Sequence, residues 1–163
     1  LGICGGFQML GHEIHDPDGV DGPPGRIDGL GLLDVATTMR HEKTVQPVEG
    51  HDVVGDLPVT GYEIHAGETV GPDCHRAMFL LDKGPDGARS ADGRISGTYV
   101  HGMFASDAFR ERWLVEAGAS ELTRFNYRAN VESALDSVAD HVERVVDVET
   151  LFSAAATPRF KAF

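Results

Sequence analysis

The chain has 163 residues, of which 41% are hydrophobic, so it is long and apolar enough to form one domain with a buried core. Its formal net charge of −12 argues against nucleic acid or an anionic membrane as a partner, because both would repel it. No run of about 18 apolar residues occurs, which excludes a membrane span within this sequence.

The first predicted elements are the end of a strand at residues 1–3 and a short helix at residues 7–14. Phe7, Leu10 and Ile14 share one helical face, although Gly11 weakens the segment. Residues 16–31 are dense in Gly, Pro and Asp and predict a loop. Short β-prone runs follow at residues 32–38, 43–48, 59–65, 77–81 and 95–100, with a Gly/Asp-rich turn region at 83–94.

Two helices are predicted in the last third of the chain. Ser106 is a suitable N-cap for the first, whose apolar face is Phe109, Trp113 and Leu114, and Gly118 is a suitable stop. The second runs from about 128 to 148, and its apolar stripe predicts a core-facing surface made by Val131, Leu135, Val138, Val142 and Val145. The order of elements indicates an α/β fold with some antiparallel strands.

A candidate nucleophile lies at the start of the chain, in the string Gly2-Ile3-Cys4-Gly5-Gly6. This string has the form of a nucleophile elbow with cysteine in place of serine, and small neighbours suit its strained backbone. The dipole of the following helix would favour the thiolate of Cys4, and the Gly5 amide would face an oxyanion. The alternative is a buried cysteine in a glycine-rich turn.

The longer string GICGGFQMLG, residues 2–11, resembles the nucleophile motif of the Cys/His glutamine amidotransferases. The resemblance implies that Cys4 attacks glutamine and that Gln8 helps to bind it. It also implies a class I amidotransferase-like (flavodoxin-like) sheet flanked by helices. Only residues 1–3 are left to form the strand before the elbow, so we expect a fragment truncated at its N-terminus, and the isolated fragment is expected to have little activity.

Histidine is suited to take the thiol proton and return it to the leaving ammonia. His101 ends an apolar run and precedes a glycine, a place where functional groups of open α/β sheets gather, although it could simply cap a strand. The string GTYVHG, residues 97–102, resembles the same family's histidine motif. In many relatives an acid two residues further on orients the ring, whereas Met103 stands here. This departure narrows the resemblance to the cobalamin-synthesis branch and its relatives.

The string GYEIHAGET, residues 61–69, resembles a motif of the cobyric acid synthase family. The resemblance covers residues 1–163 as the carboxyl-terminal amidotransferase domain. It implies that glutamine-derived ammonia passes to an N-terminal synthetase domain, absent from this chain, which amidates a corrinoid. No G-x-x-x-x-G-K-[ST] string occurs, so ATP and Mg are expected in that other domain and no cofactor in this chain. Successive residues of a strand point to opposite faces, which places Glu63 and His65 on the same face. That face is either a solvated polar surface or has a role near the ammonia exit or a domain interface.

No metal site is predicted. The string HEIH, residues 12–15, is one residue short of a zinc motif, residues 16–27 lack two calcium ligands, and Cys74-His75 stands alone. We interpret Cys74 as an ordinary cysteine, and an unbridged reactive Cys4 indicates a reducing cytoplasm.

Three rival functions remain open. One is amidotransfer to another acceptor, as in cobyrinate diamide synthase or in amidation of a peptidoglycan precursor. A second is a cysteine hydrolase on a related elbow fold, which would cleave peptides or esters instead of releasing ammonia from glutamine. The third is a non-catalytic docking remnant.

Overall fold

The computed structural model describes residues 1–155, which fall into two compact units, Leu1–Thr123 and the described part of Arg124–Phe163. The first unit carries the predicted site residues and every strand found within residues 1–155. Its elements, in chain order, are β1 Gly2–Ile3, α1 Gly5–Leu10, β2 Glu13–Asp16, β3 Gly25–Asp28, β4 Ala36–Asp52, β5 Pro58–Val70, η1 Pro72–His75, β6 Phe79–Leu81, β7 Gly84–Asp86, β8 Ala88–Arg89, β9 Ser96–Thr98, β10 Val100–His101, η2 Met103–Ala105 and α2 Asp107–Glu116.

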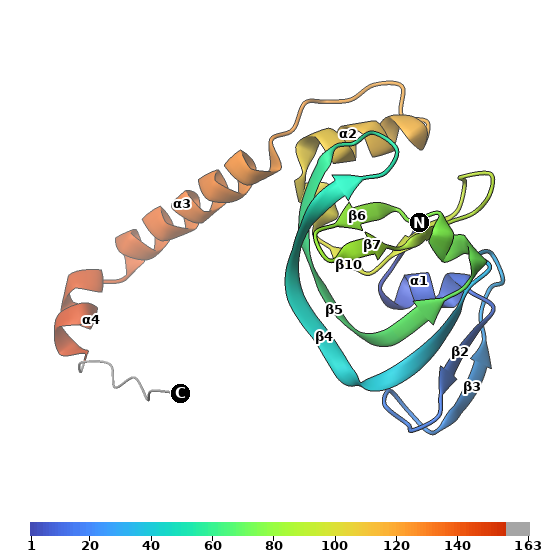
Figure 1. Cartoon of the computed structure of the whole chain (residues 1–163). Helices are drawn as coiled ribbons and strands as arrows, with labels where there is room; N and C mark the ends of the chain where they lie inside the picture. The colour runs from blue at the N-terminus through green and yellow to red at the C-terminus, as the bar shows by residue number, and fades with distance from the viewer. Residues whose placement is uncertain (156–163) are drawn as a thin grey trace. The chain divides into compact units, whose positions relative to one another are not determined.

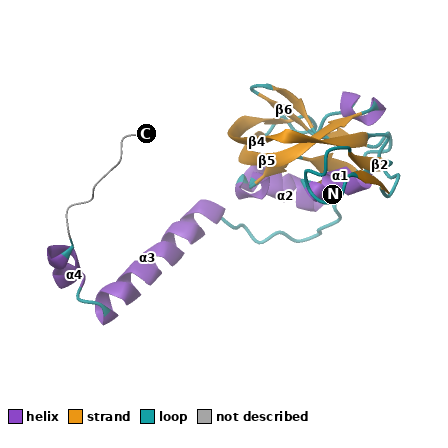
Figure 2. Ribbon diagram, turned by 90° about the horizontal axis from the view of Figure 1, so that it is seen from below, coloured by secondary structure: helices purple, strands orange, loops and turns teal. Residues whose placement is uncertain are grey.

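The strands of this unit form two mixed sheets. The smaller has the order β1-β9-β8, with β1 parallel to β9. The larger has the order β10-β5-β4-β2-β3, and β6 pairs with β4 while β7 pairs with β6. Long curved β4 and β5 dominate the first unit (Figure 1), and α1 and α2 lie on one side of them (Figure 2). The α/β prediction is confirmed, whereas the flavodoxin-like arrangement remains a prediction.

Two apolar clusters meet at the chain segment that leads to His101. Tyr99 packs with Phe7, Leu10 and others, its ring edge-on to Phe7 at 5.2 Å between centroids. Val100, the next residue, points into the other cluster, around fully buried Phe109. Successive side chains of an extended segment point to opposite sides, so both clusters hold this segment. Each fully buried large apolar side chain contributes about 1.5–3 kcal/mol.

The predicted helix at 7–14 is wrong at both ends, because α1 begins at Gly5 and ends at Leu10. A Cβ at Gly11 would lie 2.6 Å from the Val35 carbonyl oxygen, so the chain passes Val35 closely there and turns into β2. The predicted loop at 16–31 contains β3, which pairs antiparallel with β2. All four residues of β3 are exposed, so pairing with β2, including the Arg26–Glu13 ion pair, and not burial defines this strand.

The run predicted at 43–48 lies wholly within the long strand β4, whereas the run at 32–38 shares only residues 36–38 with it. The register of β4 against β5 shifts between Met39 and Thr44. The other predicted runs overlap β5, β6, β9 and β10. The turn region at 83–94 also contains the short strands β7 and β8, which pair with β6 and β9. Pairing with neighbours therefore extends strands through residues of low β-propensity.

The helix after Ser106 is confirmed as α2, with Phe109 buried, Trp113 partly buried and Gly118 at φ 99° beyond its end. Leu114, predicted on the same apolar face, is exposed. The Ser106 side chain makes no capping bond to α2. Its hydroxyl oxygen instead accepts from the Thr60 amide at 3.4 Å.

The second unit contains α3 Tyr127–Val145 and α4 Val148–Ala154. The single helix predicted to about 148 is therefore wrong at its end. Asp147 caps a new helix by accepting from the Thr150 amide at 3.0 Å. None of the residues of α3 is buried within the second unit, so the core-facing role of its valine-rich stripe stays a prediction. An apolar stripe identifies the face that gains from burial and does not specify what covers it. No helix of residues 1–155 combines the length and apolar character needed to cross a membrane.

Candidate functional site

Cys4 occupies the sharp turn between β1 and α1. Its backbone is at φ 54°, ψ −117°, a conformation that side-chain-bearing residues rarely adopt and that costs about 1–3 kcal/mol. Hydrogen bonds hold the strain in place, because the Cys4 amide donates to the Thr98 carbonyl at 2.9 Å and its carbonyl accepts from Phe7 and Gln8. The strained turn that the elbow pattern predicts is confirmed.

The glycines around Cys4 are not equivalent. A Cβ at Gly2 would lie 2.5 Å from the Gly6 carbonyl oxygen and 2.7 Å from Leu10 Cδ1, so this position requires glycine. A Cβ at Gly5 or Gly6 would meet no atom within 4 Å among the described residues. The predicted need for small neighbours is therefore confirmed before the cysteine and not after it.

The thiol of Cys4 is free and half-buried. Its sulfur lies 3.5 Å from the Ile64 carbonyl oxygen of β5. Gly5 is the first residue of α1, and the first amides of a helix have no partner within the helix. The Gly5 amide is therefore suited to donate to a negative oxygen formed beside the sulfur.

His101 ends β10 and is followed by Gly102 in the left-handed region, at φ 76°. Its ring stacks on Tyr62 of β5, with 5.1 Å between centroids and 9° between planes. Its Nε2 atom is buried and has no hydrogen-bond partner among the described residues. Met103, at the position where many relatives carry an acid, is buried in the core. Stacking on Tyr62 restrains the plane of the ring here.

The structure brings Cys4 and His101 to the same short segment of β5. Cys4 contacts Ile64, and His101 pairs with Tyr62 across the sheet. The amide of Cys4 is also bonded to Thr98, at the end of the strand that precedes β10. Residues almost a hundred positions apart are therefore fixed by a common set of main-chain contacts.

Gln8 is buried beside this segment and held by a chain of hydroxyl groups. Its amide nitrogen donates to the Tyr99 hydroxyl at 3.3 Å, and that hydroxyl lies 2.6 Å from the Thr69 hydroxyl. A Cβ at Gly67 would lie 2.4 Å from the Gln8 nitrogen, so glycine is required for this approach. Burial raises the pKa of the Tyr99 phenol, which stays neutral at physiological pH.

A cavity of about 350 Å³ opens beside the nucleophile. It is lined by Cys4, Gly5, Gln8, Val20, Asp21, Met39, His41, Lys43, Ile64, His65 and Ala66. Cys4, Gly5 and Gln8, the residues predicted around the nucleophile, therefore share one cavity. The loop residue Asp21 and the β4 residue Lys43 were not predicted, because neither lies in a recognisable motif and only the fold brings them beside Cys4.

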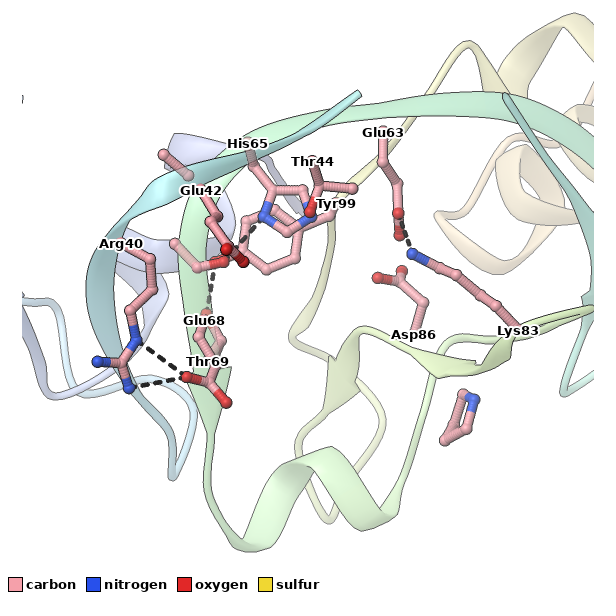
Figure 3. A pocket seen from close by; sticks show the side chains of 13 residues that line it. Arg40, Glu42, Thr44, Glu63, His65, Glu68, Thr69, Lys83, Asp86 and Tyr99 are labelled. Carbon is pink, nitrogen blue, oxygen red and sulfur yellow. Dashed lines mark hydrogen bonds and ion pairs between the residues drawn. The ribbon is translucent and has the colours of Figure 1, made fainter. Parts of the chain in front are cut away.

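A second cavity of about 400 Å³ lies across His65 and Ala66, which line both (Figure 3). Glu63 is only 1% exposed and pairs with Lys83, and Gln46 donates to it at 3.0 Å. Burial opposes the charge, but these two hydrogen bonds outweigh it and the pKa of Glu63 falls below its ordinary value. A solvated polar face, one of the alternatives for Glu63 and His65, is therefore wrong for Glu63.

Two further titratable groups line this second cavity. Burial, reinforced by the charge of Glu63, raises the pKa of Asp86 from 3.8 to about 6 although the Thr98 hydroxyl donates to it. The His65 ring stacks on Tyr99 at 3.7 Å, and its Nδ1 donates to the Gly67 carbonyl at 2.8 Å. Burial lowers the pKa of His65, so the ring is neutral near pH 7.

Within residues 1–155, no three or more His, Cys, Asp and Glu side chains are grouped in a way that could hold a metal ion. His12, from the zinc-like string, instead lies 3.1 Å from Asp34. Cys74 is half-buried, and burial raises the pKa of its thiol, which fits an ordinary, weakly reactive cysteine.

Residues 1–109 match the CobB/CobQ-like glutamine amidotransferase domain, and the chain belongs to that family. Among curated proteins, it is 55% identical over 161 residues to the cobyric acid synthase of Hyphomonas neptunium, a match that covers 99% of this chain and 32% of the relative. It is 52% identical over 155 residues to the cobyric acid synthase of a Ruegeria species, covering 95% of this chain and again 32% of the relative. The chain thus spans about a third of the length of these relatives.

Proposed function

We propose that this chain is the glutamine amidotransferase part of a cobyric acid synthase. In this proposal it releases ammonia from glutamine for the amidation of corrinoid carboxylates in cobalamin biosynthesis. The observation that carries the proposal is the strained turn at Cys4, within the segment that matches the amidotransferase family. The names of the relatives favour a corrinoid acceptor over a peptidoglycan precursor.

The first chemical step forms a thioester. The Cys4 sulfur attacks the carboxamide carbon of glutamine while His101 takes the thiol proton, and the Gly5 amide donates to the oxygen that becomes negative. When the tetrahedral intermediate collapses, His101 returns the proton to the leaving nitrogen and ammonia departs. The free Nε2 of His101 and the free thiol of Cys4 support these roles.

The second step consumes water. His101 takes a proton from a water molecule, whose oxygen attacks the thioester carbon, and the sulfur leaves and regains a proton. Glutamine and water are thereby converted to glutamate and ammonia. In this scheme Gln8, held by the Tyr99 hydroxyl, forms part of the glutamine site.

The remaining components of the proposal lie in a longer polypeptide. Because the relatives are about three times as long, we infer that this chain works beside an N-terminal synthetase domain, and we call that polypeptide the complete enzyme. ATP and Mg belong to the synthetase domain. No group of His, Cys, Asp and Glu side chains within residues 1–155 fits a metal ion. The steps above use only glutamine, water and the side chains and amides of this chain. We also propose a class I, flavodoxin-like sheet for the whole amidotransferase domain and, from the free thiols, a cytoplasmic location.

The test is a nitrogen-donor comparison in the complete enzyme. Cys4→Ala should abolish amidation from glutamine while amidation from free ammonium continues, because only the first reaction needs the thioester. Cys74→Ala, which removes the other free thiol, should leave both reactions intact. Continued use of glutamine by the Cys4→Ala variant would refute the proposed nucleophile.

A further inference from the structure

The cavity beside Cys4 carries polar and charged side chains that the proposed chemistry does not use. Asp21 comes from the loop between β2 and β3, and His41 and Lys43 come from β4. Thioester formation concerns only the carboxamide end of glutamine. The other end of this amino acid carries an ammonium and a carboxylate, so it needs a group of each sign.

A bulge in β4 aims Lys43 at this cavity. Met39 pairs with Gly67 and Thr44 pairs with His65, so residues 40–43 all face Ala66 alone. Extra residues in one strand break the ladder and redirect side chains. The side chains of residues 40–43 line the two cavities in alternation. Arg40 and Glu42 line the cavity of Figure 3, whereas His41 and Lys43 line the cavity of Cys4.

The loop that carries Asp21 is fixed by Asp16, the last residue of β2. The Asp16 carboxylate accepts from the backbone amides of Val20 at 2.8 Å and Asp21 at 2.9 Å. These hydrogen bonds lower the pKa of Asp16. The carboxylate is therefore charged near neutral pH and continues to accept from both amides of the loop. Asp21 is therefore presented to the cavity by a defined turn.

The side chains of Lys43 and Asp21 have no partner among the described residues. Neither side chain makes a hydrogen bond or ion pair within residues 1–155, whereas the cations of the neighbouring cavity, Arg40 and Lys83, are paired with Glu68 and Glu63. His41 faces Asp18 at 3.7 Å. His65, on the shared wall, is neutral near pH 7 because burial lowers its pKa.

We propose that Lys43 binds the α-carboxylate of glutamine and that Asp21 binds its α-ammonium group. The inference rests on the proposed function and adds the two residues that select a free amino acid. The cavity volume, about 350 Å³, lies at the small end of the range for small-molecule sites and suits one amino acid. Two opposite charges beside a nucleophile form a complementary site for a zwitterion.

The first test measures glutamine-dependent ammonia release by the complete enzyme. Lys43→Ala and Asp21→Asn should each raise KM for glutamine about tenfold, the effect of one charge-assisted hydrogen bond, and change kcat much less. Lys43→Arg, which keeps the charge, should stay near the wild-type KM. Two matched controls should also stay near it: Glu42→Ala, on the same bulge, and Asp28→Asn, on the same β2–β3 hairpin.

Substrates that lack one charged group of glutamine test which group each side chain binds. γ-Aminobutyramide lacks the α-carboxylate, so Lys43→Ala should not lower kcat/KM for this compound further. Glutaramate lacks the α-amino group, so Asp21→Asn should not lower kcat/KM for it further. Iodoacetamide, which has no amino-acid head group, should alkylate Cys4 at the wild-type rate in both variants, because the nucleophile itself is unchanged.

The outcomes separate the two claims. If the wild-type complete enzyme releases no ammonia from glutamine, the proposed function fails and the inference fails with it. If the wild type is active and both variants keep its KM, the inference alone is refuted. Equal losses on glutamine and on the truncated substrates, with slower alkylation of Cys4, would indicate a structural role and would also refute it.

Discussion

Replacement of Asp86 by asparagine should change the pH dependence of folding stability in a defined direction. Asp86 is 8% exposed, and its environment raises its pKa from 3.8 to about 6, chiefly through burial. A folded-state pKa above the unfolded value means that the native chain binds the proton more tightly. The stability from this group is therefore complete below about pH 3.8 and is lost as the pH rises through about 6.

The size of the effect follows from the two pKa values. The difference between 3.8 and about 6 corresponds to about 3 kcal/mol, since one pKa unit corresponds to 1.36 kcal/mol. Asn keeps the shape of the side chain and an oxygen that accepts from the Thr98 hydroxyl, but it carries no charge. At pH 7, Asp86→Asn should therefore be up to about 3 kcal/mol more stable than the wild type.

The measurement is urea unfolding at several pH values between 4 and 7. The fluorescence of Trp113, the only tryptophan of the sequence, reports unfolding because its side chain packs against the core. The stability difference between variant and wild type should grow across this range. The exposed neighbour Asp82 provides a control, because Asp82→Asn should follow the wild-type curve. A difference that stays constant from pH 4 to pH 7 would show that Asp86 is not the titrating group.

Two further predictions concern the base and the packing beside the nucleophile. His101→Asn should slow glutaminase turnover by about a hundredfold to ten-thousandfold, and the exposed His75→Asn should not; equal losses would contradict the assignment. Gly97→Ala should destabilise the chain by about 1–3 kcal/mol, because a Cβ there would lie 2.1 Å from Phe7 Cδ2, and an unchanged urea midpoint would refute this packing.

Two buried carboxylates line the second cavity, Glu63 on β5 and Asp86 on β7, and their pKa values differ for a physical reason. Glu63 keeps its charge through Lys83 and Gln46, whereas the pKa of Asp86 rises towards neutrality. Strong donors hold the pKa of a buried carboxylate low, as at Glu63. At Asp86, burial and the charge of Glu63 raise the pKa although the Thr98 hydroxyl and the Tyr99 amide donate to it. Removing Lys83 would leave the charge of Glu63 buried with Gln46 as its remaining side-chain donor.

Local sequence indicated the turn at the nucleophile and the extended segment before His101. The crowding at Gly2 arises from residues a few positions apart, whereas the positive φ of Cys4 is also held by the Thr98 carbonyl, almost a hundred positions away. The β-prone run at 95–100 likewise indicated extended chain before His101, but its division into β9 and β10, which lie in different sheets, depends on pairing with β1 and β5. Backbone crowding between near neighbours and short-range periodicity can both be recognised in the sequence itself.

Only the tertiary structure decided which distant residues share a cavity. The continuity of β4 and its bulge depend on the register with β5, and β3 exists through pairing with β2. The burial of Glu63 and the approach of Lys43 to Cys4 follow from those pairings. Hydrogen-bond register and burial are set by contacts between residues far apart along the chain, so no local pattern encodes them.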